Sequence, residues 1–332
     1  MLIEDQHPLN KSIEVGLIGR PNVGKSSLIN ELVGVDLSIV SPLPQTTRNR
    51  FSAMANIDHT EIILTDTPGI NYSNQEFIKR MMGQTKRALE HAELILFLID
   101  PSQDLLEQWD IIKDFLPSSL KSGKNAFLWP IITKSDLLPE ESRQSKMWDS
   151  LFEAIKSFFP QSIPAIFVSA KTQENIHLLT SGIEKLAKPA RHLYPDGDLS
   201  NKNERFFVSE YIREQAFHLL KEELPYETAV LIDNFQENFK SKEKNPNLVA
   251  KIEATILVNR ESQRPIVIGQ QGKMIRDICA QAKIKIEKLL QGKVDLKLHV
   301  KSSPKWTSNN YILEELGLPR VENSNRVWRK HA

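Results

Sequence analysis

Residues 19–26 read Gly-Arg-Pro-Asn-Val-Gly-Lys-Ser, which is the G-x-x-x-x-G-K-[ST] pattern of a phosphate-binding loop. An apolar run at 13–18 precedes this loop, and a helix-like segment at 27–32 follows it. The glycines let backbone N–H groups turn toward phosphates, Lys25 can reach the terminal phosphates, and the Ser26 hydroxyl can ligate Mg²⁺. The stretch therefore predicts a nucleoside triphosphate site. A chance glycine-rich turn is disfavoured by these flanking segments and by the motifs downstream.

Three further motifs follow in a fixed order: Asp66-Thr-Pro-Gly69, Thr133-Lys-Ser-Asp136 and Ser169-Ala-Lys171. Each stands at the end of an apolar run, at 62–64, 131–132 and 166–168, and another such run lies at 94–99. Nearly continuous apolar strands that end in functional loops are typical of a parallel sheet covered by helices on both faces. The expected fold is an α/β P-loop GTPase domain.

The chemistry of these motifs points to GTP. Asp66 would hold Mg²⁺ through water, and the Gly69 N–H would sense the γ-phosphate. The carboxylate of Asp136 can accept hydrogen bonds from guanine N1–H and the exocyclic amine, which adenine cannot offer. Because a buried carboxylate without those donors is costly, we expect discrimination on the order of 10⁴ or more.

The length and composition indicate the number of domains and the cellular compartment. A chain of 332 residues favours two domains. The single cysteine, Cys279, excludes a disulfide within the chain and favours a reducing compartment; its helical apolar surroundings favour core packing over reactivity. No apolar stretch approaches the ~20 residues of a membrane span, and the polar start is unlike a signal peptide. We expect a soluble, cytoplasmic protein.

The net charge of +1 conceals an asymmetry. Residues 1–199 carry 20 Lys and Arg against 25 Asp and Glu, whereas residues 200–332 carry 23 against 17. Within 248–305 the count is 12 basic against 5 acidic residues. Such an excess suggests a polyanionic partner, although a solvated lysine-rich face is the ordinary alternative.

A motif inside this basic segment favours the polyanion. Residues 266–278 contain V-I-G-x-x-G-x-x-I-x-x-I, in which Gly269 and Gly272 would make a tight turn between two helices. A turn without side chains can approach a sugar-phosphate chain, and KH modules clamp about four single-stranded nucleotides in this way. The surrounding pattern predicts a helix at 208–224, strands at 228–239 and 250–259, the helix pair, and a strand at 295–300. This order resembles an α+β type II KH domain.

A GTPase domain followed by a C-terminal KH domain resembles the Era family of bacterial GTPases, a branch of the TrmE/Era/EngA class, over almost the whole chain. The residues that carry the resemblance are Pro44-Gln-Thr-Thr-Arg48, Asp66-Thr-Pro-Gly69, Phe207-Val-Ser-Glu-Tyr-Ile-Arg213, Glu222-Glu-Leu-Pro225, Arg260-Glu-Ser-Gln263 and Lys305-Trp306. The resemblance implies GTP hydrolysis, binding to the 3′ end of 16S ribosomal RNA and assistance in maturation of the small (30S) ribosomal subunit. It also implies peripheral association with the inner membrane. We expect a monomer.

The expected site residues fall into four groups. GTP or GDP would contact Gly19, Arg20, Pro21, Asn22, Val23, Gly24, Lys25, Ser26, Ser27, Asp66, Thr67, Pro68, Gly69, Thr133, Lys134, Asp136, Ser169, Ala170 and Lys171. Mg²⁺ would be held by Ser26, Thr47 and, through water, Asp66, with Thr46 as the alternative to Thr47. Catalysis would depend on Asn22, Lys25, Thr47 and Gly69. RNA would contact Ile268, Gly269, Gln270, Gln271, Gly272, Lys273 and Arg276.

Several residues depart from the family pattern. Thr133 stands where the guanine motif usually has Asn, so one bond to the base or to the phosphate loop is lost or is replaced by one from a shorter hydroxyl. Trp129-Pro130 falls in a central strand, and because proline removes a ladder donor we expect a bulge or a weakened strand there. The KH turn reads Gly-Gln-Gln-Gly where the family often has basic residues, which predicts weaker RNA binding or more reliance on other contacts.

Catalysis is predicted to need an additional positive charge. Ile70 follows Gly69, where many regulatory GTPases carry the glutamine that orients water, and an isoleucine cannot do this. Asn22 could ligate a monovalent cation, K⁺, between the phosphates; the alternative is that its side chain only closes a turn. If no such ion binds, Arg48 of the switch region or the ribosomal partner would supply the charge.

We divide the chain into a GTPase domain at 1–190, a linker at 191–205, a KH domain at 206–318 and a basic tail at 319–332. A disordered tail is favoured over an RNA-contacting one. Polar residues and prolines at 188–205 predict a linker where domain rearrangement can occur. The first switch, 37–50, and the second switch, 69–87, would order around Mg²⁺ and γ-phosphate.

Two other classes of function are compatible with parts of the sequence. A metabolic P-loop kinase would share residues 19–26 but would not carry Thr133-Lys-Ser-Asp136 together with Ser169-Ala-Lys171. An RNA-binding protein with a degenerate nucleotide domain would lack Lys25, Ser26 or Asp66, and all three are present. A GTPase that binds RNA is therefore the preferred interpretation.

Overall fold

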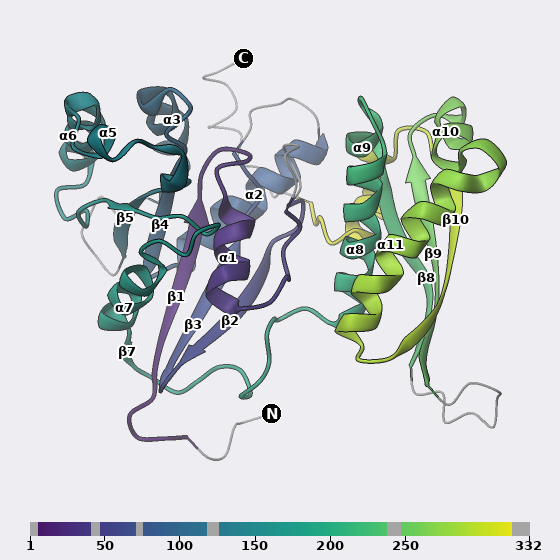
Figure 1. The fold of residues 1–332 in the computed structure, drawn as a ribbon, viewed down its shortest axis with the longest axis horizontal. Helices are drawn as coiled ribbons and strands as arrows, with labels where there is room; N and C mark the ends of the chain where they lie inside the picture. Colours follow the sequence, from purple (N-terminus) through teal and green to yellow (C-terminus); the bar gives the residue numbers. More distant parts are fainter. Residues whose placement is uncertain (1–5, 41–46, 71–75, 118–125, 238–246, 321–332) are drawn as a thin grey trace.

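A computed structural model describes residues 6–40, 47–70, 76–117, 126–237 and 247–320. It contains two α/β units joined by an extended segment (Figure 1). The first unit holds a sheet with strand order β2-β3-β1-β4-β5-β6, in which β2 is antiparallel to β3 and the others are parallel; β7 pairs with β1. Its strands are β1 Lys11–Ile18, β2 Phe51–Ile57, β3 Thr60–Asp66, β4 Leu94–Ile99, β5 Phe127–Ile132, β6 Ile166–Phe167 and β7 Lys188–Pro189.

Helices cover both faces of this sheet because its central strands alternate between two apolar cores. In β4, Leu96 faces the core beneath α1 and α7, whereas its neighbour Phe97 faces the core beneath α2, α3 and α6. The helices are α1 Lys25–Val33, α2 Glu76–His91, α3 Leu105–Ile112, α6 Asp149–Phe158 and α7 Ile176–Leu186, with short turns η1 Ser135–Leu137, α5 Glu140–Arg143 and η2 Lys146–Trp148. The predicted α/β fold is confirmed.

The bulge predicted at Trp129-Pro130 is absent: β4 and β5 pair without a register shift from Leu94↔Phe127 to Ile99↔Ile132. The N–H groups of Phe127 and Thr133 both donate to the β4 side, so by strand alternation the nitrogen of Pro130 points to the other side. There β6 pairs only from Ile131 onward. The missing donor therefore falls where no ladder bond is required, which is why the proline is tolerated.

The second unit is a three-stranded sheet of order β10-β9-β8, with β9 parallel to β10 and antiparallel to β8. Two long helices, α8 and α11, pack together and against this sheet (Figure 1). The elements are α8 Glu204–Leu219, α9 Leu224–Glu227, β8 Ala229–Glu237, β9 Leu248–Val258, η3 Glu261–Gln263, α10 Arg264–Ile268, η4 Gln270–Gly272, α11 Lys273–Leu289, β10 Lys293–Ser302, η5 Trp306–Ser308 and α12 Asn310–Glu315. This helix–strand–strand–helix–helix–strand order agrees with the predicted type II KH domain.

The helix predicted at 208–224 ends earlier than expected. Leu220 is already extended, and Glu222 has a φ of 57°, which interrupts helical backbone. A separate short helix, α9, then begins with Pro225 in its first turn. This break gives the chain an additional helix end that faces the GTPase domain.

The segment between the two domains is attached to the GTPase sheet over much of its length. Met54 N–H donates to the carbonyl of Leu199, and Asn201 N–H donates to that of Ser52, which extends the sheet past its edge strand β2. The buried carboxylate of Glu61 also accepts bonds from the N–H groups of Leu193 and Tyr194 at 2.9 and 3.0 Å. The predicted linker is thus hydrogen-bonded to β2 and β3 rather than free.

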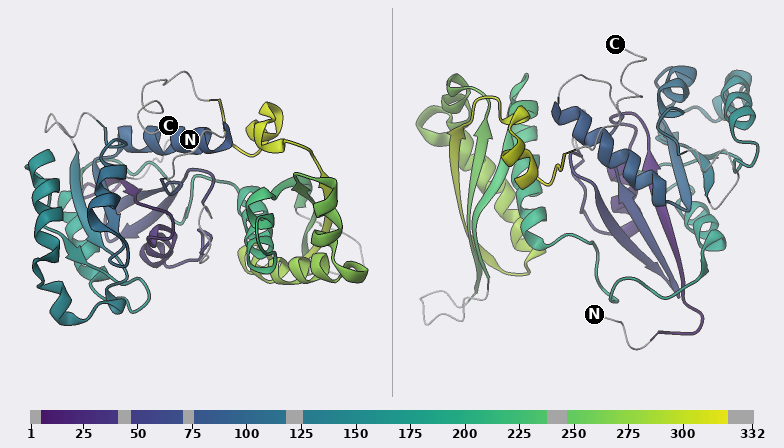
Figure 2. Two further views of the ribbon diagram at one scale, coloured as in Figure 1. Left: turned by 90° about the horizontal axis from the view of Figure 1, so that it is seen from above. Right: turned by 180° about the vertical axis from the view of Figure 1, so that it is seen from behind.

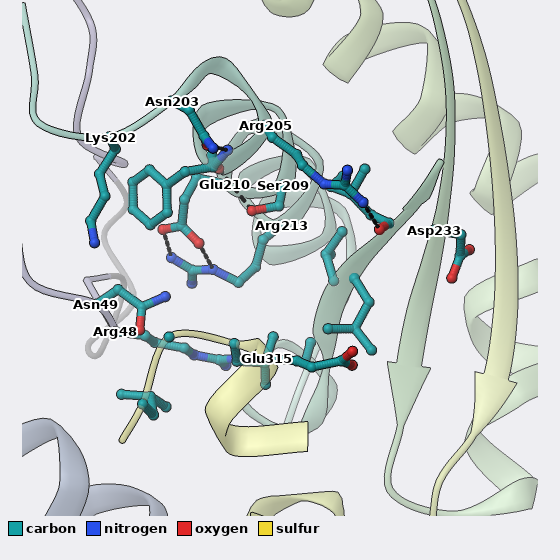
Figure 3. Close-up of a pocket in the computed structure, with 18 of the residues that line it drawn as sticks. Arg48, Asn49, Lys202, Asn203, Arg205, Ser209, Glu210, Arg213, Asp233 and Glu315 are labelled. Carbon is teal, nitrogen blue, oxygen red and sulfur yellow. Dashed lines mark hydrogen bonds and ion pairs between the residues drawn. The ribbon is translucent and has the colours of Figure 1, made fainter. Parts of the chain in front are cut away.

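The two domains contact each other directly. Helix α12 lies beside α2, where Arg80 donates to the carbonyl of Leu318 at 3.0 Å and to the side chain of Asn310 (Figure 2). Tyr211 of α8 donates to the carbonyl of Asp36 at 2.9 Å. Between these contacts lies a cavity of about 580 Å³, lined by Arg48 of the first switch and by Glu210 and Arg213 of α8, among others (Figure 3).

Candidate functional site

The phosphate loop connects β1 to α1, and its backbone requires glycine at two positions. Gly24 has a φ of 101°. A Cβ at Gly19 would lie 2.7 Å from Val23 and 2.9 Å from the carbonyl oxygen of Leu98. Of the other loop residues, Arg20 forms an ion pair with Glu107 of α3 at 2.7 Å, so its side chain is directed away from the phosphate position.

Lys25 lies inside the loop with only 6% of its surface exposed. Its Nζ donates to the carbonyls of Gly19 and Arg20 at 3.1 and 2.9 Å. Burial lowers the pKa of Lys25 to about 8, although the nearby carboxylate of Asp66 opposes this change. The ammonium group is therefore largely charged at neutral pH and is held where phosphate oxygens would meet it.

Three predicted metal ligands converge next to Lys25. The hydroxyl groups of Ser26 and Thr47 are 3.1 Å apart, and Thr47 Oγ1 donates to Asp66 Oδ2 at 3.3 Å. The hydroxyl of Ser38, a residue that no sequence motif predicted for this site, donates to the same oxygen at 2.9 Å. The alternative ligand Thr46 lies outside the described residues.

Asp66 is suited to a divalent cation. Its carboxylate is fully buried, and Oδ1 has no hydrogen-bond partner in the described part of the chain. Burial raises the pKa of Asp66 to about 6, against the opposing effects of Lys25 and the Ser38 hydroxyl. Hydroxyl and carboxylate oxygens are the ligands that Mg²⁺ prefers, so this donor set fits the predicted metal.

The second motif packs directly against the phosphate loop. Ile70 N–H donates to the carbonyl of Gly19, and a Cβ at Gly69 would lie only 2.8 Å from Pro21 Cα. Thr67 is anchored below by a 2.6 Å bond from its hydroxyl to the carbonyl of Leu17, and Pro68 O accepts a bond from the Thr85 hydroxyl. The side chain of Ile70 is buried in the apolar core under α2, so it does not contact the nucleotide position.

A second cavity of about 250 Å³ adjoins the loop at the carboxyl ends of β5 and β6. Asp136 stands in its wall, with Oδ1 accepting a 2.7 Å bond from the Ser169 hydroxyl. The cavity brings together the third and fourth motifs and the start of α1: Gly24, Ser27, Leu28, Thr133, Lys134, Asp136, Leu137, Val168, Ser169, Ala170 and Lys171. Its size and its carboxylate suit a guanine base.

Thr133 bonds to the phosphate loop, although it stands where the guanine motif usually has an asparagine. Its Oγ1 donates to the carbonyl of Val23 in the phosphate loop at 2.7 Å, and it lies 3.0 Å from the carbonyl of Ile99. The shorter hydroxyl therefore still ties the guanine motif to the phosphate loop.

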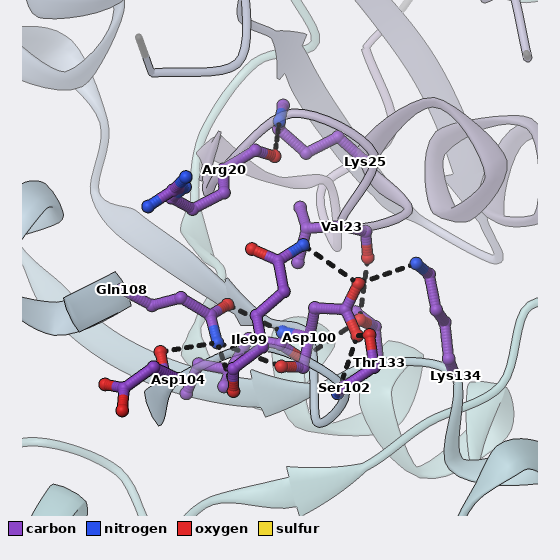
Figure 4. A network of polar contacts seen from close by, with 11 residues as sticks. Arg20, Val23, Lys25, Ile99, Asp100, Ser102, Asp104, Gln108, Thr133 and Lys134 are labelled. Atoms are coloured by element: carbon purple, nitrogen blue, oxygen red, sulfur yellow. Dashed lines mark hydrogen bonds and ion pairs between the residues drawn. The ribbon is translucent and has the colours of Figure 1, made fainter. Parts of the chain in front are cut away.

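Sequence reasoning missed Asp100, which lies at the end of β4. Lys134 Nζ donates to its Oδ2 at 2.7 Å, and Ser102 donates to its Oδ1 through both the hydroxyl and the N–H (Figure 4). Burial opposes ionisation of Asp100, but these donors outweigh it and hold the pKa below its usual value. The one feature of the sequence that could have indicated Asp100 is its position: it directly follows β4, the strand next to β5, which leads into the guanine motif.

The KH turn lies on the side of its domain away from the GTPase domain (Figure 1). Gly269 and Gly272 both have a φ of 74°, and a Cβ at Gly269 would lie 2.7 Å from the backbone of Met274. Gln270, Gln271, Lys273 and Arg276 are exposed, while Ile268 is half-buried. Arg276 Nη1 donates to the carbonyl of Gln271 at 2.6 Å, so this charge is held beside the turn.

The fold and the two sites define a P-loop GTPase joined to a KH domain. Two family models agree: that of the 50S ribosome-binding GTPases matches residues 14–134, and that of the KH domain matches residues 223–307. The chain is 36% identical to GTPase Era of Geobacter sp. (strain M21) over 308 residues, which cover 91% of this chain and 96% of that protein. It is 35% identical to GTPase Era of Crocosphaera subtropica, covering 94% and 93% respectively.

Solved structures give the same result. Era in complex with MgGDPNP and nucleotides 1506–1542 of 16S ribosomal RNA has a TM-score of 0.82 at 30% identity, covering 93% of this chain and 99% of that one. An Aquifex aeolicus Era variant bound to GDP and AlF₄⁻ has a TM-score of 0.83 at 30% identity, with the same coverage. The chain belongs to the Era family of GTPases. No helix among the described residues is long and apolar enough to cross a membrane.

Proposed function

We propose that this chain is a ribosome biogenesis factor that hydrolyses GTP, binds the 3′ end of 16S ribosomal RNA through its KH domain, and assists maturation of the small ribosomal subunit. The observation that carries this proposal is the turn from Gly269 to Gly272, in which positive φ angles at both glycines make a tight turn and leave Gln270 and Gln271 exposed to a sugar-phosphate chain. A relative matching nearly the full length is known bound to this RNA.

For GTP, we propose the following division of roles. Lys25 neutralises charge on the terminal phosphates, Ser26 and Thr47 hold Mg²⁺ with Asp66 acting through water, and Asp136 recognises guanine. When bound, Mg²⁺ would stabilise negative charge on the β- and γ-phosphate oxygens. The Gly69 N–H would donate to the γ-phosphate. A relative bound to MgGDPNP supports Mg²⁺ and GTP as the ligands of this site.

K⁺ at Asn22 is a further part of the proposal. Asn22 is exposed in the phosphate loop with a φ of 61°, and Ile70 is buried away from the nucleotide position. Arg48, the alternative source of charge, points into the KH domain instead. A cation held by Asn22 would supply positive charge at the reacting phosphates, a role worth ~10³–10⁵ in rate in related enzymes.

We propose the boundaries 1–190, 191–205 and 206–318 for the two domains and their linker; most of the tail at 319–332 lies outside the described residues. Peripheral membrane association and a monomeric state remain predictions.

The test of the function is crosslinking of RNA to the full chain in cells, followed by sequencing. Reads concentrated at the 3′ end of 16S RNA are expected, and reads spread over unrelated RNAs would refute the proposal.

A further inference from the structure

Arg48, in the first switch, places its guanidinium group inside the KH domain. Nη1 donates to the carbonyl of Thr228 at 2.5 Å, and Nη2 donates to the carbonyls of Pro225 and Tyr226 at 3.0 and 3.1 Å. The side chain is only 5% exposed. Figure 3 shows it at the edge of the cavity between the domains, facing Arg213 of α8.

These carbonyls accept bonds from side chains elsewhere in the chain, although that of Pro225 also accepts a local bond from the Thr228 hydroxyl at 3.1 Å. Helix α9 spans only Leu224–Glu227, and the last carbonyls of a helix have no partner within it. Arg48 serves those of Pro225, Tyr226 and Thr228, and Trp306 Nε1 donates to that of Glu227 at 2.8 Å. A cation is also favoured at a helix C-terminus by the helix dipole. A residue of the first switch thus caps a helix of the KH domain.

Three aromatic rings surround the same guanidinium. Its Cζ lies 5.3 Å from the ring centre of Phe77, 5.4 Å from that of Phe217 and 6.0 Å from that of Trp306. Phe77 belongs to α2 of the GTPase domain, while the other two belong to the KH domain. Burial and the nearby charge of Arg213 lower the pKa of Arg48 to about 9, so the group is still charged at neutral pH. A buried charge is tolerated only while its partners stay in place.

The residue before Arg48 is Thr47, whose hydroxyl contacts Ser26 and Asp66. Consecutive Cα atoms are about 3.8 Å apart, so Arg48 cannot move far without moving Thr47. On the other side, Arg50 N–H donates to Gln84 Oε1 at 2.7 Å, and Gln84 Nε2 donates to the carbonyl of Gly317. The end of the first switch is therefore held by contacts that include residues of the KH domain, Gly317 among them.

We propose that Arg48 is a positioning residue for GTP hydrolysis: the KH domain, by holding its guanidinium, orders Thr47 at the metal site. The inference rests on the proposed role of Thr47 as an Mg²⁺ ligand. The GTPase site is in this sense completed by the KH domain. A movement of α9 away from the GTPase domain would release Thr47 and lower turnover without changing any residue that contacts the nucleotide.

The test uses the full chain with Arg48→Met, which keeps an unbranched apolar side chain in place of the aliphatic part of arginine and removes the guanidinium group with its charge and donors. We measure kcat and KM for GTP, the Mg²⁺ concentration for half-maximal hydrolysis, and the affinity for GDP. The expected result is a loss of about tenfold in kcat and a higher Mg²⁺ requirement, with GDP affinity changed less than about twofold. GDP is the internal control because it lacks the γ-phosphate around which the switch orders, and its retained affinity reports an intact domain.

Two more variants separate positioning from general weakening of the interface. Phe217→Leu removes one ring from the KH side, at a residue remote from the nucleotide, and should raise the Mg²⁺ requirement in the same direction. Asn310→Ala removes a bond to Arg80 elsewhere in the interface and should leave kcat and the Mg²⁺ requirement unchanged.

If Arg48→Met unfolds, Arg48→Lys replaces it; lysine lacks the planar fork that reaches several carbonyls, so the same loss of kcat is expected.

Wild-type kcat and Mg²⁺ dependence in Arg48→Met, or equal changes in Asn310→Ala, would overturn the inference. Thr47→Ala distinguishes this from failure of the proposed metal site. If Thr47→Ala lowers hydrolysis and raises the Mg²⁺ requirement while Arg48→Met does neither, only the role of Arg48 is wrong. If Thr47→Ala has no effect either, the proposed metal site itself is wrong.

Discussion

The hydroxyl of Ser169 donates a 2.7 Å hydrogen bond to Asp136 Oδ1, which orients that carboxylate in the wall of the cavity that we propose for guanine. The two residues come from different motifs, on loops that follow β5 and β6. Because the hydroxyl fixes the carboxylate before any ligand binds, little reorganisation is needed to meet the two donors of guanine. We therefore expect the base specificity of the site to depend on the pair of Ser169 and Asp136 rather than on Asp136 alone.

Asp136→Asn should move the specificity of the enzyme from GTP toward xanthosine triphosphate. An amide at this position replaces one acceptor by a donor, which suits the oxygen that xanthine carries in place of the guanine amine. We expect GTP affinity to fall by about 100-fold or more and xanthosine triphosphate affinity to rise, measured by competition binding. Full retention of GTP preference would mean that Asp136 does not contact the base.

Lys25→Ala should lower GTP hydrolysis by about 10³-fold or more, because a positive group at the β and γ oxygens carries much of the catalysis of phosphoryl transfer. Single-turnover hydrolysis is the appropriate measurement. Thermal unfolding serves as the control, since Lys25 also donates to two carbonyls of the loop and its removal could loosen that loop locally. Turnover within tenfold of the wild type would exclude this site.

Much of the nucleotide site could be predicted from the sequence because each motif is local: a few adjacent residues set both the loop conformation and the chemistry. Ser38 and Asp100 escaped prediction because their contacts, to Asp66 and Lys134, join segments 28 and 34 residues apart without a shared motif. The attachment of the linker to the sheet was not predicted, for a different reason. Its bonds to β2 are made largely by backbone groups, which a polar sequence does not reveal.

Of the two outcomes predicted at Trp129-Pro130, a bulge or a weakened strand, the bulge does not form. Proline is harmful only where its nitrogen faces a paired strand, and the sequence of one strand does not show which of its neighbours is shorter. Arg48 was a candidate for the phosphate site from its neighbours in the sequence alone. The sequence could not show that Arg48 instead donates to the carbonyls of α9, because that contact depends on how the two domains pack.

The stability of the metal-free protein should depend on pH through Asp66. The pKa of this carboxyl is raised from 3.8 to about 6 in the folded state, so the folded protein holds its proton more tightly than the unfolded chain. Stability is therefore greatest below about pH 4 for this group and falls as pH rises to about 6, by up to about 3 kcal/mol. Urea unfolding in EDTA measures this, and Asp66→Asn should remove that part of the slope. An unchanged slope in the variant would assign it to other groups.

Hydrolysis should be faster in KCl than in NaCl at equal ionic strength, and Asn22→Ala should abolish the difference. The larger K⁺ suits a loose shell of amide, carbonyl and phosphate oxygens better than Na⁺ does. GTP affinity of the variant is the control, because the phosphate loop must still bind nucleotide. Equal rates in the two salts for the wild type would leave the ribosomal partner as the source of the missing charge, since Arg48 is turned into the KH domain.

The central claim, that the KH turn binds the 3′ end of 16S ribosomal RNA, is tested most directly by fluorescence anisotropy with a labelled oligonucleotide of that sequence. Changing Gly269 and Gly272 to Asp would remove binding, but a Cβ at Gly269 also collides with the Met274 backbone. The sharper variant is Gln270→Asp with Gln271→Asp, since both side chains are exposed and Asp tolerates the φ of 49° at position 271. We expect salt-sensitive RNA binding by the wild type, a loss of RNA affinity of at least about tenfold in the variant, and unchanged GTP affinity. Equal RNA affinity of variant and wild type would contradict the central claim.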